Sequence, residues 1–238
     1  MKRRKAGIGI FVIVLIITAV RVKSMDSHRI SGRILAENIA GPGMLRLVEQ
    51  SMQARARKTS TFDDGPDIRY TPLLLDGLKE RNVRVSFFLL GEKVEQYPEL
   101  VERMQKEGHL VGNHTYHHVQ LNKLNETKAR EEILKTNNLI YETTGVYPLY
   151  LRPPFGAWKK NLELCVEMLP VFWTIDTLDW KVQNTEKIVR TVQEKIEDGA
   201  IILMHDEYDT SVEAALQVVD ELKNQGYELV TVDQLILP

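Results

Sequence analysis

The chain has 238 residues, of which 43% are hydrophobic and 27% are charged, and its formal net charge is −2. This is the composition of an ordinary globular protein, and the length suits one domain with a sizeable core. Residues 1–24 hold six Lys or Arg and no acidic residue, so the remainder has 25 basic against 33 acidic residues, a net charge of −8. Such an acidic body excludes nucleic acid as the expected partner.

The N-terminal residues have the pattern of an export signal. Basic residues at 2–5 precede an apolar run at 6–20, which is the order found in such signals. The run is shorter than the ~20 residues of a comfortable membrane span, and no Ala-x-Ala cleavage site follows it. We expect residues 1–24 to form an uncleaved signal-anchor that holds the body outside the membrane. A cleaved signal peptide, and hence a secreted protein, is the alternative. Residues 25–56 are expected to form a linker and 57–238 the folded domain.

Beyond the linker, short apolar runs alternate with helical patterns. The patterns predict strands at 83–90, 110–113, 150–152, 171–175, 201–204 and 228–232, and helices at 70–81, 98–107, 125–144, 161–169, 185–197 and 211–225. Thr185 is the expected N-cap of its helix. Repeated alternation of strand and helix predicts an α/β fold with a mainly parallel sheet and helices outside it. Nearly every polar motif follows a strand, where barrels of this kind place their chemistry.

Two adjacent carboxylates, Asp63 and Asp64, lie in the sequence Thr-Phe-Asp-Asp-Gly-Pro at 61–66. Like charges so close raise each other's pKa unless a cation neutralises them. Gly65 permits backbone angles closed to other residues, and Pro66 prevents a strand from continuing. The motif therefore predicts a strand end that delivers two carboxylates to a turn. Taken alone, the motif is more typical of a common surface turn, and only the later motifs favour a functional site.

Histidines follow the strand predicted at 110–113. His114 and His118 are spaced i, i+4, so one helical turn would place both imidazoles on the same side. With one carboxylate of the first motif they would supply three ligands and leave a position for water, the pattern of a catalytic metal site. A cluster of exposed loop histidines is the alternative. His117 is expected to point away from His114, and His109 to be exposed.

Three further motifs follow later strands. Arg152 precedes two prolines and could clamp a carboxylate through parallel hydrogen bonds; a solvent-facing Arg in a rigid turn is as good an interpretation. His205 ends an apolar strand and suits general acid work, with a carboxylate such as Asp179 raising its pKa. A structural histidine is the alternative there, and core packing is the alternative for Trp180.

In this order and spacing, the five motifs resemble those of the polysaccharide deacetylases of the NodB-homology type, carbohydrate esterase family 4. The resemblance covers about residues 59–235. It implies a distorted (β/α) barrel of seven or eight strands. It also implies metal-dependent removal of N-acetyl groups from GlcNAc or MurNAc residues of chitin-like oligomers or peptidoglycan. Some members of the family instead remove O-acetyl groups from xylan.

The resemblance assigns a role to each matching residue of the metal centre. Asp63 matches the catalytic base, and Arg152 matches the residue that orients it. Asp64, His114 and His118 match the ligands of a divalent cation. Zinc is the expected metal, although cobalt, nickel or iron could occupy the same ligands.

Five more residues match positions around the substrate. The amide of Phe155 matches the oxyanion contact, Trp180 part of the pocket wall, and Leu203 the lining of the pocket for the acetyl methyl group. His205 matches the catalytic acid, and Asp179 the carboxylate that tunes it. The implied partner is an acetylated amino-sugar polysaccharide.

One stretch departs from the family's pattern. Residues 55–60 are polar and basic, where the family has an apolar strand. Basic residues are costly in a central strand, so we expect this strand to be very short or locally altered. The departure favours one alternative to an N-deacetylase, a non-catalytic glycan-binding or structural surface protein. A second alternative is an acetyl-xylan esterase or another amidase on the same scaffold.

Overall fold

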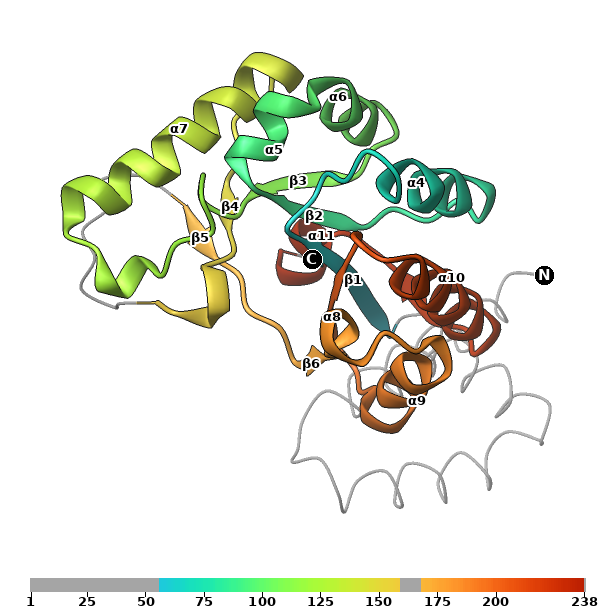
Figure 1. The fold of residues 1–238 in the computed structure, drawn as a ribbon. Helices are drawn as coiled ribbons and strands as arrows, with labels where there is room; N and C mark the ends of the chain where they lie inside the picture. Colours follow the sequence, from blue (N-terminus) through green and yellow to red (C-terminus); the bar gives the residue numbers. More distant parts are fainter. Residues whose placement is uncertain (1–55, 159–167, 238) are drawn as a thin grey trace, which may run out of the picture. The chain divides into compact units, whose positions relative to one another are not determined.

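The computed structural model describes residues 56–158 and 168–237, which belong to one compact unit, Gln53–Pro238 (Figure 1). The predicted signal-anchor, nearly all of the linker and most of the helix predicted at 161–169 lie outside the described residues. Within the described ranges, no helix is both long enough and apolar enough to cross a membrane.

The centre of the fold is a parallel sheet of eight strands in the order β5-β4-β3-β2-β1-β7-β6, with β8 beside β1. The strands are β1 (Arg57–Asp63), β2 (Ser86–Leu89), β3 (Leu110–Asn113), β4 (Tyr150–Leu151), β5 (Leu169–Pro170), β6 (Ile175–Asp176), β7 (Ile201–His205) and β8 (Glu228–Leu229). Among the described residues β5 and β6 are the two edges and do not pair. The predicted α/β fold is confirmed, as a curled half-barrel rather than a closed ring.

Helices surround this sheet: most lie on its convex side, and the last packs inside the curve against Phe88 and Tyr150 (Figure 1). They are α4 (Thr71–Glu80), α5 (Gly91–Gln96), α6 (Pro98–Lys106), α7 (Glu126–Thr144), α8 (Asp179–Val182), α9 (Thr185–Lys195), α10 (Asp209–Asn224) and α11 (Val232–Ile236). The largest apolar cluster joins the buried faces of α4, α6, α9 and α10 to one face of the strands, including Phe62 and Met204. Because strand side chains alternate between faces, the neighbouring residues of the same strands point to the concave side.

The first strand corrects an expectation. β1 is the longest strand, at seven residues, and its residues from Lys58 to Asp63 are buried. Its lysine and its last threonine have partners: Lys58 Nζ lies 3.2 Å from Asp198 Oδ1 and over the ring of Tyr227, and Thr61 Oγ1 donates to the Ile202 carbonyl at 2.8 Å. Paired polar groups avoid the cost of burial, so the strand is neither short nor interrupted.

Three other predictions about elements are wrong. The strand predicted at 171–175 does not form, because the chain leaves β5 at one edge of the sheet and crosses to β6 at the other. The strand predicted at 228–232 ends at Leu229, since Thr231 forms a capping box with Gln234 that starts α11. The cap of α9 is Asn184, whose side chain accepts from the Lys187 amide at 3.0 Å, and not Thr185.

His109, expected to be exposed, is only 3% exposed. It sits between α6 and β3, its Nδ1 accepts from the Val85 amide at 3.1 Å, and its ring lies edge-on to Phe87. Burial lowers the pKa of His109 to about 4. Since the pKa is near 6.5 in an unfolded chain, the unfolded state binds this proton more readily at every pH between these values.

The folded state should therefore lose stability as the pH falls from about 6.5 towards 4. His109→Asn can keep an acceptor for the Val85 amide but cannot titrate. Between pH 7 and 5, the stability advantage of wild type over this variant should shrink by about 2 kcal/mol, measured by urea unfolding. An advantage that is the same at both pH values would contradict the prediction.

Candidate active site

The two adjacent carboxylates stand at the end of β1. Asp63 is its last residue, and Asp64 follows with a φ of 69°, so the two side chains leave the strand in different directions. Gly65 is required here by a close approach and not, as we expected, by unusual backbone angles. A Cβ at Gly65 would lie 2.5 Å from Oδ1 of the buried Asp206. The turn is thus packed tightly against the end of β7.

His114 and His118 lie in the loop that follows β3. This loop is not the predicted helical turn, since Thr115 and His118 have φ values of 67° and 54°. The two imidazole rings nevertheless lie 5.0 Å apart. His117 points elsewhere, to the carboxylate of Glu132 on α7 at 2.8 Å. The i, i+4 spacing correctly predicted that the two rings lie close together, but the helical backbone assumed for it does not form.

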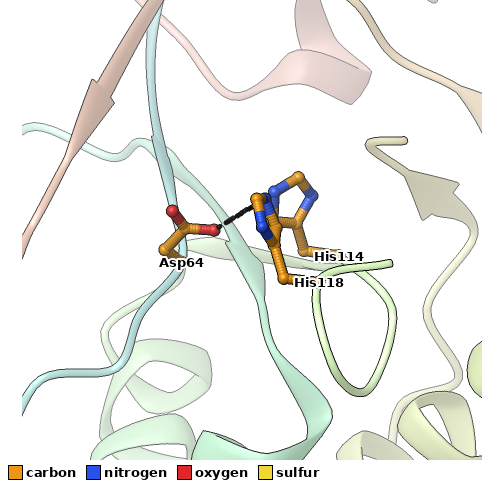
Figure 2. Close-up of side chains that lie close together, drawn as sticks. All are labelled: Asp64, His114 and His118. Atoms are coloured by element: carbon orange, nitrogen blue, oxygen red, sulfur yellow. Dashed lines mark ion pairs between the residues drawn. The ribbon is translucent and has the colours of Figure 1, made fainter. Parts of the chain in front are cut away.

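Asp64, His114 and His118 converge on a common point (Figure 2). Asp64 Oδ1 lies 3.3 Å from His114 Nε2 and 3.4 Å from His118 Nε2. Tetrahedral bonds of about 2.0–2.1 Å separate neighbouring ligand atoms by about 3.3–3.4 Å, so these separations suit one cation.

The chemistry of these atoms also suits a cation. Asp64 Oδ1 is buried and has no hydrogen-bond partner. His114 Nδ1 lies 2.6 Å from the Arg152 carbonyl, which can only accept, so Nε2 carries the lone pair that faces Asp64. Burial lowers the pKa of His118, which favours the neutral ring that binds metals. Burial alone would raise the pKa of Asp64, but the histidines that face it hold it well below its usual value.

Asp63 is held separately by Arg152. Arg152 is fully buried, and its Nη1 donates to Asp63 Oδ1 at 2.8 Å. The guanidinium also bonds to the hydroxyl of Thr61, and it lies 4.2 Å from the centre of the Phe88 ring. Since the carbonyl of Arg152 also binds His114, one residue orients both the carboxylate and a histidine of the metal cluster.

His205 ends β7 on the other side of Asp64. Its Nδ1 lies 2.8 Å from Asp179 Oδ1, and its amide donates to Asp179 Oδ2 at 2.8 Å. Burial alone would lower the pKa of His205, but the hydrogen bond and charge of Asp179 raise it to about 9. The other nitrogen, Nε2, lies 3.8 Å from Asp64 Oδ2. His205 can therefore present a proton toward the cluster near neutral pH.

Comparison with known proteins agrees with this geometry. The sequence profile of the polysaccharide deacetylases matches residues 54–171. A peptidoglycan-N-acetylglucosamine deacetylase of Bacillus cereus is 39% identical over 188 residues, which cover 76% of this chain and 68% of that protein. This chain belongs to the polysaccharide deacetylase family.

Two further polysaccharide deacetylases are similar. The peptidoglycan-N-acetylglucosamine deacetylase PgdA of Listeria monocytogenes is 38% identical over 217 residues, which cover 91% of this chain and 46% of that protein. The chain thus spans about half the length of this relative. The structure of the peptidoglycan deacetylase PdaC from Bacillus subtilis superposes with a TM-score of 0.74 at 40% identity, covering 77% of this chain and 91% of the other.

Of the three remaining predicted site residues, Phe155, Leu203 and Trp180, only Phe155 has a described contact with the cluster. Phe155 has a φ of 59° and its ring lies 4.5 Å from the ring of His118. Leu203 is buried in β7. Trp180, on α8, is 49% exposed, so it is not a core residue, and no described contact brings its ring to the cluster.

Sequence reasoning missed two acidic residues that support the candidate site. Asp206 directly follows His205, is fully buried and bonds to the hydroxyl of Thr71. Burial raises its pKa to about 7. Glu132 lies in the middle of α7 and bonds to the histidine loop. The sequence after His205 could have indicated Asp206, but an acid within a charged helical segment carries no signal for Glu132.

Proposed function

We propose that this protein is a metal-dependent N-deacetylase acting on the amino sugars of cell-envelope polysaccharide. The observation that carries the proposal is the convergence of Asp64, His114 and His118, with Asp63 and His205 placed on either side of them. This arrangement combines three metal ligands, a general base and a general acid. The names of the relatives support peptidoglycan as the substrate class.

Each acid-base group has a task in amide hydrolysis. Asp63, held by Arg152 at 2.8 Å, accepts a proton from the attacking water. The Phe155 amide donates to the oxygen on which negative charge develops. His205, kept protonated by Asp179, gives its proton to the departing amine. An amide needs this acid because an expelled amide anion would be far too basic.

The metal ligands in this proposal are Asp64, His114 and His118, and zinc is the expected ion. A bound divalent ion supplies a Lewis acid for the acetamide carbonyl and lowers the pKa of a water molecule towards ~7. Two imidazoles and one carboxylate suit zinc, while cobalt, nickel and iron accept the same donors.

We also propose that the protein is exported and that residues 1–24 tether it to the membrane. The basic residues at 2–5 and the apolar run at 6–20 support export. Mass spectrometry of the N-terminal peptide of the mature protein, recovered from membrane and medium fractions, distinguishes a retained anchor from a cleaved signal peptide.

An acetate-release assay tests the proposed activity. Zinc-loaded protein is incubated with chitin oligomers, peptidoglycan and acetyl-xylan, each with and without a chelator. We expect acetate from the amino-sugar substrates, its loss with chelator, and its return when zinc is restored. Acetate from xylan alone would identify an O-acetyl esterase. Binding of glycan by the metal-loaded protein without any acetate would identify a non-catalytic surface protein.

A further inference from the structure

We propose that Glu132 of α7 is a positioning residue for the metal centre: its carboxylate holds the loop between the two histidine ligands and so sets metal affinity. This inference rests on the proposed metal site, but it concerns a residue outside the five motifs. Glu132 is placed 14 residues beyond His118 in the chain and reaches the loop from a helix on the outside of the sheet.

The contacts of Glu132 with the loop are specific. Its Oε2 accepts from the amides of Tyr116 at 3.0 Å and His117 at 2.9 Å, and its Oε1 lies 2.8 Å from His117 Nδ1. Only 16% of the Glu132 side chain is exposed. A carboxylate that accepts from two successive backbone amides holds the chain itself, in contrast to a surface ion pair, which would hold only the imidazole. Bonds to a charged acceptor are also about twice as strong as neutral ones.

The loop needs such support because its backbone is strained. Thr115 and His118 have φ values of 67° and 54°, in the left-handed region. Such a conformation is unfavourable for a residue other than glycine and persists only when the surroundings impose it. Thr115 is β-branched, which makes this region still less favourable. His118 is itself a proposed ligand, so release of the strain would move a metal-binding nitrogen.

Other groups bind other polar atoms of the loop backbone, so Glu132 is responsible for one stretch, the amides of residues 116 and 117. The Asn113 side chain accepts from the Thr115 amide at 2.7 Å. The carbonyls of Thr115 and Tyr116 accept from the amides of Gly91 and Glu92, at the start of α5, at 2.9 and 3.3 Å. The two amides nearest to His118 on its N-terminal side are those that Glu132 binds. We therefore expect loss of Glu132 to affect His118 more than His114.

Three variants test this role. Glu132→Ala removes all three bonds, Glu132→Gln keeps an oxygen that can accept from the amides but has no charge, and Glu131→Ala alters the exposed neighbour on the same helix. The measurements are zinc affinity by competition with a chelator, the visible absorption of the cobalt-loaded protein, and hydrogen exchange of the peptide that contains residues 116–117. The melting temperature of the metal-free proteins reports folding.

We expect Glu132→Ala to weaken zinc binding by about 10- to 100-fold, as loss of outer-shell partners does elsewhere, with faster exchange of the loop and an altered cobalt spectrum. Glu132→Gln should recover part of the affinity, and Glu131→Ala should match wild type. Wild-type affinity and cobalt spectrum in Glu132→Ala would overturn the proposal. If that variant does not fold, wild-type affinity together with wild-type loop exchange in Glu132→Gln would overturn it. These measurements need no turnover, so a wild-type protein that binds zinc but releases no acetate would refute the proposed activity alone.

Discussion

Replacement of His114 by alanine is expected to abolish metal binding and deacetylation together. His114 is buried, its Nδ1 is committed to the Arg152 carbonyl, and its Nε2 faces Asp64 at 3.3 Å. Binding free energies of about 10–16 kcal/mol for sites with four ligands correspond to about 3 kcal/mol per ligand. The loss should therefore be roughly 10²- to 10³-fold in affinity, with acetate release near background. Metal content after dialysis and acetate release measure both effects.

His117→Ala is the matched control, because it removes a histidine of the same loop whose ring points to Glu132 and away from the cluster. This variant should keep its metal, since the two backbone amides still bind Glu132. Retention of metal and activity in His114→Ala would refute the assigned ligand set. Equal losses of metal and activity in both variants would show that metal binding depends on the conformation of the loop and not on Nε2 of His114.

The second large effect is expected for His205→Ala, which should keep the metal and lose turnover by about 10²- to 10⁴-fold, the range of general acid catalysis. His205 is bonded to Asp179 at 2.8 Å, and its pKa is raised to about 9, so it holds a proton when the amine departs. His205 is not one of the three residues whose ligand atoms converge on the metal position, so its loss should leave the metal in place.

A substrate whose leaving group needs no proton separates this role from a structural one. With an activated phenyl ester the leaving group departs as an anion, so the loss in His205→Ala should be far smaller than with an N-acetyl sugar. Equal losses on amide and ester would indicate a general disturbance of the site. Equal rates of wild type and variant on the amide would remove His205 from the mechanism.

The elements were largely predictable where local signals are strong. The strand at Leu110–Asn113 and the long helix α7 appear as predicted, the latter with Asn125 as its cap and Gly145 in the left-handed conformation behind it. Prediction failed where residues distant in the sequence stabilise an element. The sequence of β1 suggests a strand too polar for the centre of a sheet, but Asp198 and the ring of Tyr227 stabilise its buried Lys58. These partners are more than 100 residues away in the chain, so no local pattern contains them.

The candidate site shows the same division. The residues that converge in the structure were all identified from the sequence, because carboxylates and histidines at strand ends are rare enough to be informative. The backbone around them was not predicted, since the histidine loop is strained and non-helical. Glu132 and Asp206 also support the site, although no sequence motif marked them for this role. Their roles depend on which helix packs beside which loop.

The sequence by itself determined the family, the alternation of strands and helices, and the side chains available for chemistry, because each of these is written in short-range patterns. Only the tertiary structure decided that Arg152 binds Asp63 and His114 at once, that His109 is buried, and that α7 reaches the metal loop. The reason is physical: such contacts arise when parallel strands and their helices pack, and packing joins residues that lie far apart in the chain.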